Sequence, residues 1–161
     1  MSDPIELLER RVRAVTTGER GTSGLHFFCQ IGGRYDDKGI TTLQVSGSGW
    51  ALLSWRAVEE ADMYNFQFDQ DEIERFYQML LDYPFWRANP ARRSRRDGEV
   101  NVHLRLSDQI AGTCNGIQFW TGDVDEFATL RELMINVGQL IDHLSDGEIP
   151  LVDFSSKSIP A

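Results

Sequence analysis

The sequence predicts an α+β protein with a mostly antiparallel, five-stranded sheet, or a six-stranded one, and helices on one face. Three segments place apolar residues at helical spacing, and the segments between them alternate apolar and polar residues with period two. The predicted order is α-β-β-β-α-β-β-α. Strands that follow one another without intervening helices favour antiparallel pairing, and this order favours helices gathered on one side.

Each predicted helix opens with an acidic residue, a type that suits the N-cap. The first begins at Asp3 and ends near residues 16–18. The second begins at Asp69, which a glutamate follows three residues later, and it stops before Pro84. The third runs over 123–146 and has the longest apolar stripe.

The strand pattern falls into two groups. We expect strands over 27–31, 42–45, 50–55, 100–106 and 117–120. Alternating aromatic residues at 64–68 allow a sixth strand. In the last two strands polar residues occupy every second position, which indicates that the second face of the sheet is partly in contact with water.

The length of 161 residues predicts a single domain. We place this α+β domain at residues 1–148. Residues 149–161 contain two prolines and three serines, and we expect them to form a loosely docked C-terminal tail.

Charge and composition narrow the environment and the partners. The formal net charge of −9 argues against nucleic acid as a partner, because phosphate binding needs a basic surface. No stretch approaches the roughly 20 apolar residues of a membrane span, and the N-terminus does not read as a signal peptide. Cys29 and Cys114 read as reduced, buried thiols. We therefore expect a cytoplasmic protein, and the acidity fits a basic protein partner.

The most unusual segment is 86–97, where five arginines interrupt an acidic sequence. Guanidinium groups suit carboxylates and phosphates, so the segment is interpreted either as an anion or acidic-peptide contact, or as a solvated loop whose arginines pair with nearby acids. The following strand and the end of the last strand add further candidates. The predicted binding residues are Arg87, Arg92, Arg93, Arg95, Arg96, His103, Arg105 and Trp120.

No catalytic or metal-binding constellation stands out. Cys114 and His103 are the only nucleophile and base that we can pair, across the last hairpin, and no flanking signature supports them. His26 and Cys29 are three residues apart and so point to opposite faces of a strand. Residues 46–49 are glycine-rich, but a strand follows them, so they read as a hairpin turn. We expect no catalytic residue, cofactor or metal.

Two resemblances follow from these segments. Residues 43–49, 82–86 and 97–100, with the leucine-rich last helix, resemble small uncharacterised bacterial α+β proteins that have no assigned activity. The element order, size and acidity are similar to those of class I type III secretion chaperones. That resemblance implies an acidic, dimeric protein that binds secreted proteins.

These observations lead to two hypotheses of different classes. The first is a non-enzymatic protein-interaction module of the bacterial cytoplasm, immunity-type or chaperone-like, with a protein partner or a second copy as its ligand. The second is a small enzyme or an anion- or ligand-binding domain. Its pocket would lie between the arginine-rich loop and the adjacent strand face and would contain Arg92, Arg93, His103 or Cys114.

Overall fold

The computed structural model describes residues 4–17, 21, 23–33 and 36–154. The α-helices are α1 (Pro4–Thr16), α2 (Gln70–Asp82) and α3 (Ala128–Ser145). Short 3₁₀ helices occupy η1 (Phe85–Arg87) and η2 (Thr121–Asp125). The strands are β1 (Leu25–Ile31), β2 (Ile40–Ser46), β3 (Trp50–Arg56), β4 (Ala61–Gln67), β5 (Asn101–Asp108) and β6 (Thr113–Trp120).

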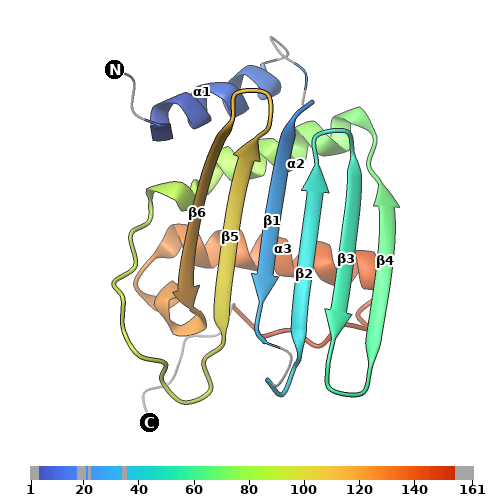
Figure 1. The fold of residues 1–161 in the computed structure, drawn as a ribbon, viewed down its shortest axis with the longest axis vertical. Coiled ribbons are helices and arrows are strands. Elements are labelled where there is room, and N and C mark those ends of the chain that lie inside the picture. The colour runs from blue at the N-terminus through green and yellow to red at the C-terminus, as the bar shows by residue number, and fades with distance from the viewer. Residues whose placement is uncertain (1–3, 18–20, 22, 34–35, 155–161) are drawn as a thin grey trace.

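The strands form one six-stranded sheet in the order β4-β3-β2-β1-β5-β6 (Figure 1). Every neighbouring pair is antiparallel. The first four strands form a meander, and the β5–β6 hairpin joins it at β1. The α+β class and the antiparallel sheet are confirmed, and β4 makes the six-stranded alternative the correct one.

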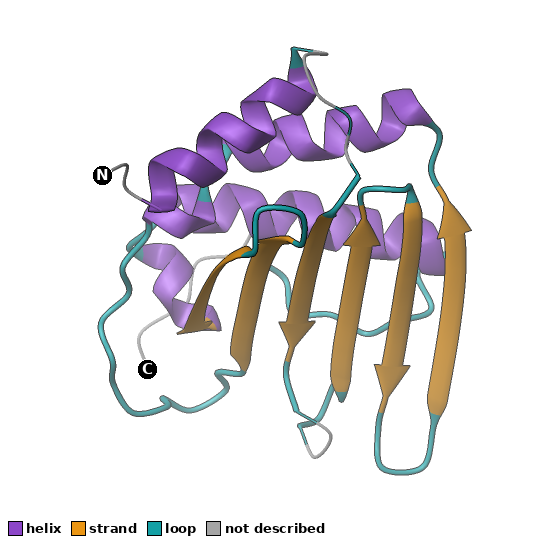
Figure 2. Ribbon diagram, turned by 45° about the horizontal axis from the view of Figure 1, so that its top comes forward, coloured by secondary structure: helices purple, strands orange, loops and turns teal. Residues whose placement is uncertain are grey.

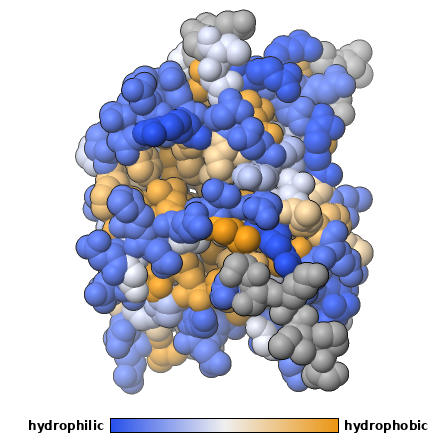
Figure 3. All heavy atoms as spheres, turned by 180° about the vertical axis from the view of Figure 1, so that it is seen from behind, coloured by the Kyte–Doolittle hydropathy of each residue, from blue (hydrophilic) through white to orange (hydrophobic). Residues whose placement is uncertain are grey.

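All three α-helices lie on one side of this sheet (Figures 1 and 2). In the four inner strands the residues directed to that side are buried, with Phe27, Leu43, Leu53 and Leu104 completely inaccessible. The buried side chains of the helices complete a single core. The outer surface of the helix layer is largely hydrophilic (Figure 3). None of the helices in the described residues is long and apolar enough to cross a bilayer.

The predicted helix caps have different outcomes. The Asp69 side chain accepts the Glu72 amide and Glu72 reaches back to Asp69, so the expected capping box is confirmed. The prediction that α3 begins at Asp123 is wrong: Asp123 lies in η2, and α3 begins five residues later. The carboxylate of Asp123 is committed to an ion pair described below. Asp3 lies outside the described residues.

Two further predictions concern the two cysteines and the C-terminal segment. Cys29 is buried, and burial raises the pKa of its thiol to about 12. Cys114 is exposed, so the expectation of a buried thiol there is wrong. In the predicted tail, Ile149 and Phe154 are buried against the core. Residues 155–161 lie outside the described residues.

Because the core lies on one side of the sheet, substitutions at neighbouring strand positions should change the free energy of unfolding by different amounts. We expect Leu53→Ala to lower the free energy of unfolding by about 3 kcal/mol, because it opens a cavity in a fully buried site. Met63→Ala, one strand away on the opposite face and 66% exposed, should change it by less than about 0.5 kcal/mol. Urea denaturation followed by tryptophan fluorescence measures both, and equal losses would contradict the one-sided core.

Candidate functional site

The side of the sheet away from the helices has no described element covering it, and we call it the open face (Figure 2). Every second residue of each strand points to it, as the alternating burial and the strand register show. It includes Trp50 and Met63, which are 59% and 66% exposed. With Leu52 on β3, and the half-buried Phe28 and Ile40 on β1 and β2, they make up an apolar area that polar residues such as Gln44 interrupt.

The open face also differs from the rest of the surface in charge. None of the strand residues directed to it, all of them within the described chain, is an aspartate or a glutamate. Its charged side chains are Arg56 and Arg105, and it carries the imidazoles of His26 and His103. On a chain of net charge −9, the open face is therefore the part of the sheet surface that lacks negative charge.

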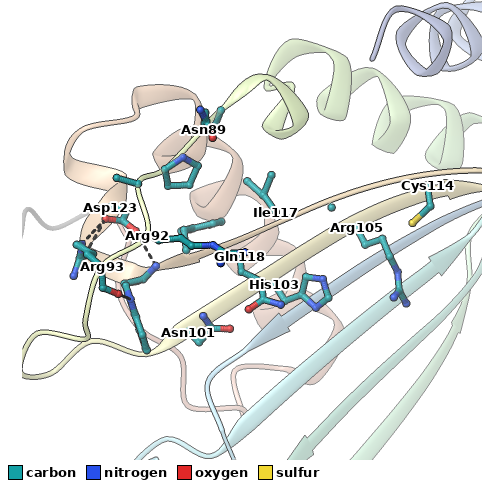
Figure 4. A pocket seen from close by; sticks show the side chains of 16 residues that line it. Asn89, Arg92, Arg93, Asn101, His103, Arg105, Cys114, Ile117, Gln118 and Asp123 are labelled. Carbon is teal, nitrogen blue, oxygen red and sulfur yellow. Dashed lines mark hydrogen bonds and ion pairs between the residues drawn. The ribbon is translucent and has the colours of Figure 1, made fainter. Parts of the chain in front are cut away.

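At one edge the open face continues into a groove, which we call the β6 groove (Figure 4). Strands β5 and β6 form its floor and residues 88–93 form its far wall, around a volume of about 710 Å³. This volume lies within the range typical of ligand pockets. Five of the predicted binding residues line it: Arg92, Arg93, His103, Arg105 and Trp120. Arg87, Arg95 and Arg96 do not.

Arg93 forms the centre of a buried ion-pair cluster. Its guanidinium donates to both carboxylate oxygens of Glu99, at 2.8 and 2.6 Å, and to Oδ1 of Asp123 at 3.0 and 2.9 Å. The second oxygen of Asp123 accepts the Trp120 amide, and Glu99 also accepts the amides of Arg96 and Gly122. A Cβ on Gly122 would lie 2.3 Å from a Glu99 oxygen, so the cluster requires glycine there.

This cluster sets the charge state of Glu99. Hydrogen bonds from Arg93 hold the pKa of Glu99 below its usual range, although burial acts in the opposite direction, and the Arg96 amide makes a smaller contribution. The same pairing raises the pKa of Arg93. Glu99 and Arg93 therefore stay ionised near neutral pH, and the cluster holds the 88–99 segment against η2.

The remaining arginines of the loop have separate destinations. Arg87 pairs with Glu9 of α1, which also accepts the Trp86 indole. Arg95 donates to the main-chain oxygen of Glu99 at 2.6 Å. The Arg96 side chain is exposed, and its main-chain amide binds Glu99. Of the five arginines, only Arg92 is an exposed residue that lines the groove.

The indole of Trp120 also has a structural role, because its Nε1 donates to the main-chain oxygen of Arg93 at 3.1 Å. This bond ties the end of β6 to the wall of the groove. The Trp55 indole is buried and donates to the main-chain oxygen of Lys38. Among the described aromatic residues, Trp50 and Phe66 are exposed, and Trp50 is the one on the open face.

Arg105 and His103 lie together on the open face around Phe28 of β1. The Arg105 guanidinium is 4.8 Å from the centre of the Phe28 ring, and the His103 ring is 5.4 Å from it at a steep angle. Burial lowers the pKa of His103, and the positive charge of Arg105 lowers it further. His103 is therefore neutral at physiological pH.

The groove does not assemble the predicted nucleophile and base. His103 faces Gln118 across the ladder, and Cys114 is four residues from Gln118, which corresponds to about 14 Å along the strand. In the described part of the chain, no group of three His, Cys, Asp or Glu residues is placed to hold a metal ion. The groove is lined by hydrogen-bonding groups, by arginines, by the His103 imidazole and by the Cys114 thiol.

Sequence reasoning missed several parts of this site. Asn89, Asn101 and Gln118 line the groove, and nothing in their spacing indicates it. Glu99 and Asp123 are distant from each other in sequence, so their shared partner was not predictable. One signal was readable: Gly116 lies inside a strand, a position where glycine often marks a close approach to the backbone.

Comparison with known proteins adds no assignment, since neither a family model nor a curated protein matches this chain.

Replacing Arg93 tests the ion-pair cluster. Arg93→Ala should lower the free energy of unfolding at pH 7 by about 3 kcal/mol, because it leaves two buried carboxylates without their partner. Arg92→Ala, one residue away and exposed, should leave it nearly unchanged. Because the pKa of Glu99 is lowered in the folded state, its stabilising effect is present at neutral pH and is lost on acidification. The cost of Arg93→Ala should therefore shrink below about pH 4, and a pH-independent cost would contradict this account.

The pKa of His103 tests the arrangement of His103 and Arg105 around Phe28 on the open face. In an NMR titration it should lie below the ordinary histidine value. Arg105→Gln should raise it, because a neighbouring positive charge is removed, while burial, the larger cause, should still hold it below the ordinary value. An unchanged or lowered pKa in Arg105→Gln would contradict the arrangement.

Proposed function

We propose that this protein is a protein-interaction module, immunity-type or chaperone-like, that holds a partner protein against the open face. The observation that supports this proposal best is the open face itself. It exposes the apolar side chains of Trp50 on β3 and Met63 on β4, carries half-buried apolar residues on β1 and β2, and lacks carboxylates. Aromatic residues and methionine are enriched at protein interfaces, and charged groups are depleted at the cores of interfaces.

The charge of the open face favours a different protein over a second copy. A pairing of two open faces would bring two copies of Arg56 and two of Arg105 into one interface, with no strand carboxylate to pair them. The net charge of −9 on each copy adds repulsion. A different protein that presents apolar and acidic side chains to this face avoids the first obstacle. The net charge alone led us to expect a basic partner, whereas the local charge favours an acidic one.

One observation favours the second hypothesis, an anion- or ligand-binding site. Arg92, Arg93, His103, Arg105 and Cys114, which come from separate parts of the sequence, all line the β6 groove. Arg93 is already paired with two acids, so Arg92 and Arg105 are the cations available to a small anion. Such a site uses the groove alone and leaves the apolar area of β1–β4 unexplained, which is why we place it second.

The proposal is tested by site-specific photo-crosslinking in the native host. A photoreactive residue at position 63 of β4 should crosslink to one defined protein, and the same residue at position 78 on the exposed side of α2 should not. The captured protein is then purified, and its affinity for the chain is measured by calorimetry. We expect Met63→Glu to weaken binding at least about tenfold, because it places a charge in an apolar contact.

The matched control for that variant is Val58→Glu. Val58 is 60% exposed, close to the 66% of Met63, but it lies in the β3–β4 turn outside the open face. Its substitution should leave the affinity unchanged. Equal losses in both variants, or crosslinks from α2 and not from β4, would contradict the proposal.

A further inference from the structure

Strand β6 is the outer strand of the sheet beside the groove, and its hydrogen bonding can be assigned residue by residue. The Thr121 amide donates to the Val100 oxygen at 3.0 Å, so Thr121 belongs to the set that bonds to the β5 side. In an antiparallel ladder this set recurs at every second residue, which leaves Cys114, Gly116 and Gln118 with outward-pointing amides and carbonyls. The Trp120 amide fits this assignment, since it points outward to Asp123.

These outward groups are open to a ligand. Cys114, Gly116 and Gln118 are exposed, and no residue in the described part of the chain hydrogen-bonds their main-chain groups. Edge strands usually carry a charge or a proline that prevents pairing with another strand. The sequence of β6 contains neither, whereas β4, at the opposite edge, carries Asp62.

The groove runs along this unprotected edge. Residues 88–93 form its second wall, and the Arg93 cluster and the Trp120 indole fix that wall in place. The groove volume of about 710 Å³ suits a short chain segment and not a folded domain. A second copy of this protein would have to bring its own sheet and helices into the same space, which the wall obstructs. The geometry therefore favours a peptide segment over a pairing of two β6 strands.

The charge of the groove indicates which peptide. Among its lining residues, Arg93 is paired with Asp123 and also with Glu99, so it is not available to a ligand. Arg92 and Arg105 line the groove with no ion pair to any described residue, but the Arg105 guanidinium lies over Phe28 of β1, on the side of β5 away from β6. The exposed guanidinium of Arg92 therefore favours a carboxylate on the ligand.

We propose that the β6 groove binds an extended acidic segment of the partner protein, which adds a strand to β6 and places a carboxylate near Arg92. This inference rests on the proposed function, because the segment would belong to the protein held on the open face. Main-chain hydrogen bonds to the edge would supply the affinity, and Arg92 would supply the selectivity.

The probe is a capped seven-residue peptide that alternates glutamate and valine, with a lysine–valine peptide as its counterpart. In the free protein, the amides of Gly116 and Gln118 should exchange with solvent faster than those of Ile117 and Phe119. Addition of the acidic peptide should slow exchange at Gly116 and Gln118, measured by NMR. The lysine peptide should have no effect. N-methylation of the peptide at one set of alternate residues should abolish binding, and at the other set should not, because only one set faces β6.

Two pairs of variants complete the test. Arg92→Gln should weaken the acidic peptide about fivefold, and Arg96→Gln, in the same loop but outside the groove, should not. Gln118→Pro removes an outward amide and should abolish binding, whereas Gln118→Ala keeps that amide and should retain it.

Four results would overturn the inference. The first is that the acidic peptide does not bind, and the second is that its binding does not depend on the position of N-methylation. The third is that inorganic phosphate displaces the acidic peptide completely, and the fourth is that exchange protection of the Gly116 and Gln118 amides rises with protein concentration alone. The last two would indicate a small-anion site and a second copy, respectively. The strand addition and the proposed function can fail independently. If a partner loses its binding to Met63→Glu but does not protect the Gly116 and Gln118 amides from exchange, only the strand addition is contradicted.

Discussion

Packing all three helices of the described chain on one side of a six-stranded sheet assigns a role to every strand residue. The helix-facing set fills the core, with Phe27, Leu43 and Leu104 fully inaccessible. The other set is not covered by any element of the described residues. A sheet face that only had to remain in water could be uniformly charged and polar. This one instead exposes Trp50 and Met63 and contains no carboxylate, which is why we interpret it as a surface for another protein.

The Arg93 cluster adds a second constraint at the edge of that face. By binding Glu99 and Asp123 together, Arg93 connects the loop after η1, the start of β5 and the 3₁₀ turn after β6. The 88–93 segment thereby stands beside β6 as a wall, and Asp123 also satisfies the last outward amide of that strand. Most arginines of the 86–97 segment therefore stabilise the fold, although their sequence also suits a ligand. The scaffold in turn creates the groove, in which Arg92 stays exposed.

The fold was largely predictable because its signals are local. Periodicity placed the helices and strands, and the Asp69–Glu72 capping box was readable directly. The start of α3 was not, because Asp123 resembles an N-cap in sequence while its carboxylate is bound by Arg93, thirty residues earlier. The site was predictable only in part for the same reason. His103 and Arg105 could be placed on a partly wet strand face, but their contact with Phe28 depends on β5 pairing with β1 across more than seventy residues. Whether Trp50 is exposed depends on which face of the sheet the helices pack against.

Hydrogen–deuterium exchange of the whole chain, with and without its isolated partner, tests the central claim most directly. The claim is that the open face, and not the helix layer, is the binding surface. Binding should slow exchange in β3, β4 and β6 and leave the exposed turns of α1 and α2 unchanged. Protection confined to the helices, with the strands and the β6 edge unaffected, would contradict the account.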